Sequence, residues 1–302
     1  MFGSHLSIAG SMSNALREAE KLGLDCVQVF TKNQQQWTAP PLKDEAVAEW
    51  AWELKRMAWG AEKVVSHASY LANLASPNDE LWEKSVGLMR EELERCERLG
   101  IRHLVFHPGA FTTSSLEEGM AKIAKACSRL VKETKGYATV LCLENVAGAG
   151  STVGRRFEEL ADIRQRTVEA TGQPDRVGYC IDTCHMHAAG YDLGSEKSAR
   201  AAVDELVAVL GADIRCMHLN DSKGKAGSHL DRHEHIGQGT IGEAGFAVVV
   251  NQPGLRGVPK VMETPKGAGP RGQEWDSINV ALLRKLCASE KETGGKRRSV
   301  RR

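Results

Sequence analysis

Short apolar runs with strand character alternate with longer helical segments along nearly the whole chain. The expected strands cover residues 5–8, 26–30, 63–67, 103–107, 139–144, 177–182, 215–219 and 260–263, mostly 35 to 45 residues apart. Eight strands that are each followed by a helical stretch predict a (β/α)8 TIM barrel, a single α/β domain, rather than an open doubly wound sheet. The strands are continuously apolar, as expected when both faces of a parallel sheet are covered.

Two of the intervening helices have recognisable ends. Ser76-Pro77 predicts the start of a helix that Gly100 ends. Ser115 and Glu118 have the spacing of a capping box at the start of the next helix. Local signals therefore agree with the alternating pattern.

Length and composition fit one globular domain. A chain of 302 residues, 41% hydrophobic and 26% charged, suits a barrel of about 250 residues. We expect a catalytic barrel over residues 1–288 and a basic, disordered tail over 289–302. The net charge of only +1 argues against binding to nucleic acid through bulk positive charge. Neither a membrane-spanning run nor a secretory signal is evident, so we expect a cytoplasmic protein with no membrane partner.

The eight cysteines are scattered, and several lie inside apolar runs such as 140–143. This pattern favours reduced core thiols in a cytosolic protein over a disulfide framework. Cys180 and Cys184 could be metal ligands, but they lack a second close pair, which favours the structural interpretation.

Potential metal ligands recur at or just beyond the carboxyl ends of six consecutive expected strands. They are His67, His107, Glu144, Asp182, His185, His218, Asp231, His233 and Glu263. Any one of them has an ordinary alternative; Asp182, for example, could simply cap a helix that begins at Thr183. Because the carboxyl ends of barrel strands meet at one rim, six such coincidences predict a metal centre there.

Nine ligands are too many for one tetrahedral zinc site, so we expect two or three ions that share bridging carboxylates. Histidines with carboxylates favour zinc, although manganese or iron would accept the same donors. Four carboxylates contribute −4 and three divalent ions +6, which leaves about +2 at the barrel mouth. Such a patch suits an anionic substrate, above all a phosphate ester, whose attacking and leaving oxygens paired ions can stabilise.

Seven segments carry a resemblance to a known family over residues 1–288. They cover residues 30–37, 67–74, 107–109, 143–145, 180–185, 218–233 and 263–265. On these segments the chain resembles the endonuclease IV family of apurinic/apyrimidinic endonucleases, zinc-dependent DNA-repair enzymes with a xylose-isomerase-like barrel.

The resemblance implies three zinc ions per chain. The first would be held by His67, His107 and Glu144, the second by Glu144, Asp182, His218 and Glu263, and the third by His185, Asp231 and His233. Glu144 would bridge the first two ions. Glu144, Glu263 and His107 would be the catalytic residues.

The implied reaction is hydrolysis of the phosphodiester 5′ to an abasic site, which leaves a 3′-hydroxyl and a 5′-deoxyribose phosphate. A metal-bound hydroxide between two zincs would attack the phosphorus, and the third zinc would neutralise the leaving oxygen. The partner would be double-stranded DNA with abasic sites or blocked 3′ ends. The enzyme would act as a monomer in the cytoplasm, associated with the nucleoid during repair.

The resemblance also implies loops that insert into DNA and flip the abasic nucleotide, which has no pairing or stacking to lose. Tyr70 and Leu71 occupy one such loop, and Gln35 and Trp37 occupy the other, although Trp37 could equally be a packing residue at the rim. Lys32, Lys223 and Arg232 are expected phosphate contacts. The chain departs from the family at Gln35, where arginine is frequent, and at Ala72, where a larger aliphatic residue is usual.

Two alternatives belong to other functional classes. Sugar isomerases and epimerases of the xylose-isomerase-like barrels also place His, Asp and Glu at strand ends, but they need fewer ligands. A catalytically silent barrel that binds nucleic acid would contain little metal. The additional set of His185, Asp231 and His233, together with the loop at Tyr70, favours the nuclease.

Overall fold

The computed structural model describes residues 1–287, and its centre is a closed barrel of eight parallel strands. Around the ring the order is β1-β10-β7-β6-β5-β4-β3-β2. These strands are β1 (Phe2–His5), β2 (Cys26–Val29), β3 (Val64–His67), β4 (His103–Phe106), β5 (Val140–Glu144), β6 (Val177–Asp182), β7 (Ile214–His218) and β10 (Lys260–Met262). The prediction of a single (β/α)8 barrel is confirmed.

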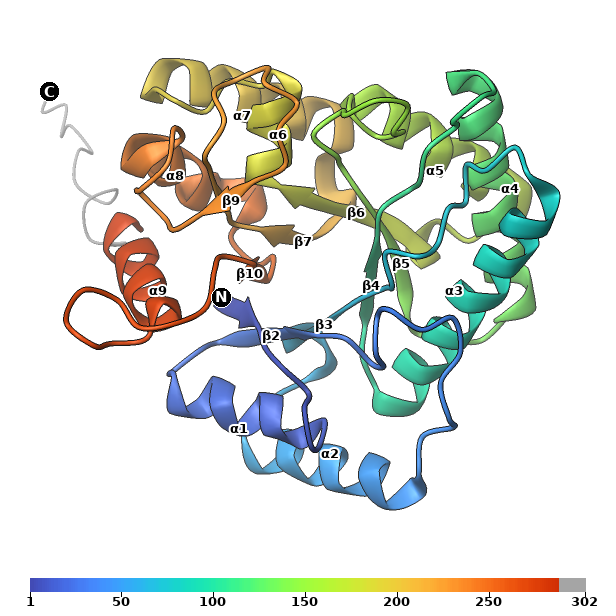
Figure 1. Cartoon of the computed structure of the whole chain (residues 1–302), viewed down its shortest axis with the longest axis horizontal. Coiled ribbons are helices and arrows are strands. Elements are labelled where there is room, and N and C mark those ends of the chain that lie inside the picture. Colours follow the sequence, from blue (N-terminus) through green and yellow to red (C-terminus); the bar gives the residue numbers. More distant parts are fainter. Residues whose placement is uncertain (288–302) are drawn as a thin grey trace, which may run out of the picture.

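Helices cover the outside of the barrel (Figure 1). They are α1 (Ser13–Lys21), α2 (Asp44–Arg56), α3 (Asp79–Leu99), α4 (Leu116–Glu133), α5 (Phe157–Thr171), α6 (Thr183–Ala189), α7 (Glu196–Leu210), α8 (Gly242–Asn251) and α9 (Trp275–Leu286). Short 3-10 turns η1 (Ala61–Lys63), η2 (Pro174–Arg176), η3 (Gly211–Asp213) and η4 (Pro253–Leu255) lie ahead of β3, β6, β7 and β10. A small antiparallel pair, β8 (Asp221–Ser222) and β9 (His233–Glu234), stands apart from the barrel.

Helix ends confirm one local prediction and correct another. The capping box of Ser115 and Glu118 is present at the start of α4. Helix α3 ends at Gly100 as predicted, but it begins two residues after Ser76-Pro77, because the side chain of Asn78 accepts the capping hydrogen bond from the Leu81 N–H.

The first strand was predicted in the wrong place. It covers Phe2–His5 rather than residues 5–8. Within it, Gly3 packs so closely against β2 that a Cβ would overlap the carbonyl oxygen of Cys26. Small residues are required at this close approach, and they conceal the strand in the sequence. The chain then turns at Gly10, which has a φ of +82°.

A compact cluster fills the barrel below its mouth. It consists of Cys26, Val65, Val105, Val140, Cys142, Cys180, Cys216 and Val261, all buried. All eight cysteines are free and seven are buried, which confirms the prediction of core thiols. This layer makes the interior a packed core and confines any open space to the rim.

None of the described helices is both long enough and apolar enough to cross a bilayer. The tail expected at 289–302 lies outside the described residues.

Candidate metal centre

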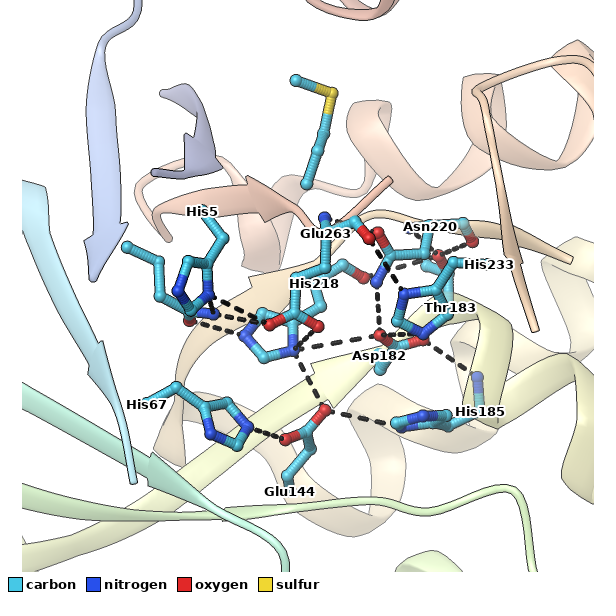
Figure 2. Close-up of polar contacts among 12 residues, drawn as sticks. His5, His67, Glu144, Asp182, Thr183, His185, His218, Asn220, His233 and Glu263 are labelled. Carbon is cyan, nitrogen blue, oxygen red and sulfur yellow. Dashed lines mark hydrogen bonds and ion pairs between the residues drawn. The ribbon is translucent and has the colours of Figure 1, made fainter. Parts of the chain in front are cut away.

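The candidate ligands on the strands follow from the two-residue alternation of side chains. Each lies two positions beyond a residue of the barrel-filling cluster, so it points into the mouth. The pairs are Val65 and His67, Val105 and His107, Cys142 and Glu144, Cys180 and Asp182, Cys216 and His218, and Val261 and Glu263. Figure 2 shows His67, Glu144, Asp182, His218 and Glu263 pointing toward one another.

His67, His107 and Glu144 form the first group, with ligand atoms within 4.8 Å of one another. The Nε2 atoms of His67 and His107 lie 3.0 and 3.2 Å from Oε2 of Glu144. Nδ1 of His67 lies 2.7 Å from the carbonyl oxygen of Ala68. Donation to that oxygen leaves the Nε2 lone pair free for a cation.

The second group shares Glu144 with the first and adds Asp182, His218 and Glu263. Nδ1 of His218 lies 2.9 Å from Oε1 of Glu144, 3.3 Å from Oε2 of Glu263 and 3.8 Å from Oδ2 of Asp182. Glu144, Asp182 and His218 have no exposed surface. The shared carboxylate therefore joins two ligand groups below the mouth.

His185, Asp231 and His233 form the third group. Oδ1 of Asp231 lies 3.2 Å from Nε2 of His185 and 3.3 Å from Nε2 of His233. The Nδ1 atoms of the two histidines contact backbone carbonyl oxygens, of Asn145 at 2.9 Å and of Glu263 at 3.2 Å. Within residues 1–287, the buried Nε2 of His233 has no hydrogen-bond partner and only carboxylate oxygens as ion-pair neighbours, as expected of a nitrogen directed at an ion.

Asp182 caps a helix and also faces the other candidate ligands. Its Oδ1 accepts a hydrogen bond of 2.9 Å from the His185 N–H and so caps α6. Its Oδ2 faces the ligand groups and accepts a 2.6 Å hydrogen bond from Nδ2 of Asn220. The capping contact also fixes His185 at the helix start, close to the second group.

The four carboxylates lack ordinary counter-ions. Among residues 1–287, every ion pair of Glu144, Asp182, Asp231 and Glu263 is with a histidine. Burial alone would raise the pKa of Glu144, but His218 and His107 hold that pKa well below its usual range. Burial likewise opposes protonation of His218, yet Glu263 and Glu144 raise its pKa to about 10.

This donor set fits divalent cations. Buried carboxylates without lysine or arginine partners are costly unless a cation neutralises them. Cys180 lies in the packed layer below the groups, which fits its structural interpretation. The thiol of Cys184 does lie near Asp182 and His233, but burial raises its pKa to about 12, so it is a poorer donor than they are.

Tyr70 stands over the first group at the rim. Its side chain is 55% exposed, and its ring centroid lies 4.9 Å from that of His67 and 5.5 Å from that of His107. It lines a hollow of about 280 Å³ together with His5, Phe30, Gln34, His233, Glu263, Thr264 and Lys266. The hollow leads from solvent to the ligand groups.

The other expected DNA contacts differ in their exposure. Gln35 is exposed, whereas Leu71 and Ala72 are half-buried and pack against the core. Trp37 also packs on the core, and Nζ of Lys84 lies 4.2 Å from its ring centroid. The packing interpretation of Trp37 therefore has direct support, since its ring already has partners.

Lys32 does not lie where a phosphate contact requires it. Its ammonium is buried, donates a 2.5 Å hydrogen bond to the carbonyl oxygen of Gln36 and lies 4.0 Å from Glu92. Lys32 therefore stabilises the loop from inside, through its contacts with Gln36 and Glu92, and its ammonium does not reach the solvent. Lys223 is exposed, 3.6 Å from Glu234, and Arg232 donates to the carbonyl oxygen of Asp231.

Several residues of the site were absent from the sequence prediction. His5 and Gln28 also point into the mouth, two positions beyond Gly3 and Cys26. Asn145 and Asn220 hydrogen-bond Asp182, and Lys266 lines the hollow. The alternation on β1 and β2 could have revealed His5 and Gln28, but neither ends an evident apolar run.

Comparisons with known proteins agree with this geometry. The family model described as xylose isomerase-like TIM barrel matches residues 16–285. "Probable endonuclease 4" of Chloroflexus aggregans is 44% identical over 286 residues, covering 94% of this chain and 97% of the relative. The relative of the same name from Geobacter sulfurreducens is 40% identical over 287 residues, covering 94% and 93%.

Solved structures show the same barrel. Endonuclease IV from Thermus thermophilus has a TM-score of 0.79 at 36% identity, covering 94% of this chain and 98% of that chain. A D-tagatose 3-epimerase-like protein has a TM-score of 0.68 at 18% identity, covering 94% of this chain and 96% of that chain, a likeness of fold alone. The chain thus belongs to the endonuclease IV family of xylose isomerase-like TIM barrels.

Proposed function

We propose that this protein is a DNA-repair endonuclease that hydrolyses the phosphodiester 5′ to an abasic site with the help of three zinc ions. The observation that carries the proposal is the junction of three ligand groups, two of which share Glu144, at the mouth of one barrel. A centre of this size exceeds what a single-ion site needs. It matches in-line displacement at phosphorus, where several cations share the developing charge.

Each ligand group would hold one ion. When bound, the ions supply a nucleophile at neutral pH and neutralise the oxygen that leaves. The chain's own residues would fix the donor atoms: Ala68, Asn145 and Glu263 through backbone carbonyls, and Asn220 through its hydrogen bond to Asp182. Zinc is the ion that these nitrogens and carboxylates favour, with manganese or iron as alternatives.

The hollow under Tyr70 would receive the flipped sugar phosphate. Its lining offers an aromatic ring above and the ligand groups below. Gln35, Lys223 and Arg232 are exposed and would meet the DNA backbone, whereas Leu71 and Trp37 would support the loops. The catalytic domain would cover residues 1–288 and act as a monomer in the cytoplasm.

The proposal is tested with a duplex that contains one abasic site. We expect a single cut 5′ to that site, a 3′-hydroxyl product, and no cut in the matched undamaged duplex. A parallel panel of ketoses tests the epimerase alternative. Sugar interconversion without strand cutting would refute the proposed function.

Tyr70→Ala is expected to weaken binding of abasic DNA roughly 5- to 150-fold, because an aromatic stack contributes about 1–3 kcal/mol. The rate at saturating DNA should change little, since Tyr70 belongs to none of the ligand groups. Trp52→Ala is a matched control, because Trp52 is 59% exposed on α2, away from the mouth. An unchanged dissociation constant for Tyr70→Ala would remove this residue from recognition.

Zinc binding should release protons near neutral pH. In the metal-free protein, burial opposes but nearby carboxylates raise the pKa of His218 to about 10 and that of His233 to about 9. Both imidazoles are therefore protonated at pH 7.5 and must lose a proton to bind an ion. Calorimetric titration in buffers of different ionisation enthalpy should detect roughly two protons or more. Affinity should rise with pH up to about 10, and proton-neutral binding would contradict the assignment.

A further inference from the structure

Gln28 occupies the position on β2 that corresponds to the ligands on the other strands, two residues beyond Cys26 of the barrel-filling cluster. Its side chain is fully buried. We propose that Gln28 is a positioning residue that fixes the ring orientation and tautomer of His218, so that Nδ1 of His218 is the atom presented to the second ion. This inference rests on the proposed metal centre.

The amide of Gln28 makes three contacts, each with a different partner. Its Oε1 lies 2.7 Å from Nε2 of His218. Its Nε2 donates to Oε1 of Glu263 at 2.6 Å and lies 2.9 Å from Nδ1 of His5. One buried amide therefore touches two members of the second ligand group.

The chemistry of the partners determines which way the amide points. A carboxylate can only accept, so the NH2 of Gln28 must face Glu263. The second amide hydrogen goes to Nδ1 of His5, which must then be unprotonated.

With the NH2 so directed, the carbonyl oxygen of Gln28 faces Nε2 of His218 and must receive its hydrogen. When Nδ1 of His218 gives up its proton on metal binding, the Nε2–H tautomer leaves the Nδ1 lone pair free for an ion that would lie among Glu144, Asp182 and Glu263. A flip of the His218 ring would place a carbon atom where Nδ1 now faces Glu144, Asp182 and Glu263. Gln28 therefore couples the orientation of the imidazole to that of Glu263.

His218 differs from three other candidate ligands in this respect. His67, His185 and His233 have their outer nitrogens beside backbone carbonyl oxygens. The backbone cannot be replaced by mutation, whereas the partner of His218 is a side chain. A change at position 28 should therefore affect the second ion selectively.

Gln28→Met is the main test, because methionine fills a similar volume without hydrogen bonds. Zinc affinity is measured by chelator competition on the metal-free protein. We expect the second ion to bind about 10- to 100-fold more weakly, the usual loss when an outer partner of a ligand is removed, and the other two to bind as before. The ¹⁵N spectrum of the zinc-loaded protein should show the His218 Nε2–H in the wild type and lose it in Gln28→Met.

Gln28→Glu is the rescue variant, since its protonated form keeps an acceptor for Nε2 of His218 and an O–H donor for Oε1 of Glu263. The Nε2–H signal should persist in it, and its loss would overturn the inference even if Gln28→Met failed to fold. Ser66→Ala is the control: Ser66 is buried on the neighbouring strand, one residue out of phase with the ligands, and should leave all three affinities unchanged.

Equal zinc affinities in folded Gln28→Met and the wild type would overturn the role of Gln28 alone. Failure of the wild type to bind zinc would instead overturn the metal proposal, and this inference with it. The two failures are distinguishable because neither measurement uses DNA cleavage.

Discussion

Glu144→Ala is expected to abolish strand cleavage, with a fall in rate of at least about 10³-fold, while binding of abasic DNA is retained. Glu144 belongs to both of the first two ligand groups and is completely buried. Losing it would disturb two ions at once, and each ion stabilises transition-state charge by several kcal/mol. Binding is expected to persist because neither the third ligand group nor Tyr70 at the rim includes Glu144.

The measurement is single-turnover cleavage of a duplex with one abasic site, beside a binding titration of the same duplex. Glu53→Gln is the matched control, because Glu53 is also buried but pairs with Arg17 and Arg56 on the outer helices. That variant should cleave at the wild-type rate even if it unfolds at a lower temperature. Retained cleavage in Glu144→Ala would contradict the bridging assignment.

Removal of the metal ions is expected to lower the melting temperature by more than about 10 °C. An ion present at about a thousand times its dissociation constant adds about 4 kcal/mol to stability, and about 1 kcal/mol moves Tm by roughly 2 °C in a domain of this size. Losing three ions would by this reasoning lower Tm by well over the stated minimum. In the metal-free protein, however, the charges of protonated His218 and His233 offset part of the loss in stability.

The test compares thermal unfolding before and after chelation, with elemental analysis of both samples, and then adds back zinc. Recovery of Tm on zinc addition is expected, since the first two ligand groups lie at the ends of strands that the barrel itself holds in place. A folded protein whose Tm is unaffected by complete metal removal would show that these carboxylates are stabilised in another way.

The barrel and the clustering of the candidate ligands were predictable because both depend on short-range regularities. Apolar runs determine the strands, and closure brings the residues at their carboxyl ends, such as His67 and Glu144, to one rim. The strand at Phe2–His5 was missed because Gly3 is required by a close packing contact with Cys26, which is distant in sequence. No local pattern reports such a contact.

The outer parts of the site depended on tertiary contacts and were harder to predict. Lys32 resembles an exposed phosphate contact in the sequence, but Glu92 of α3 lies close to its ammonium in the interior. A glutamine within a strand does not by itself indicate a metal site. The role inferred for Gln28 follows only from its hydrogen bonds with His218 and Glu263. Side-chain hydrogen bonds across the barrel are not encoded in spacing along one strand.

Anomalous diffraction at the zinc absorption edge, from crystals of the zinc-loaded protein, tests the three-ion centre most directly. We expect three peaks at the barrel mouth, two of them on either side of Glu144 and the third between His185, Asp231 and His233. A single peak, or zinc bound elsewhere while these side chains remain paired only with one another, would contradict the three-ion centre.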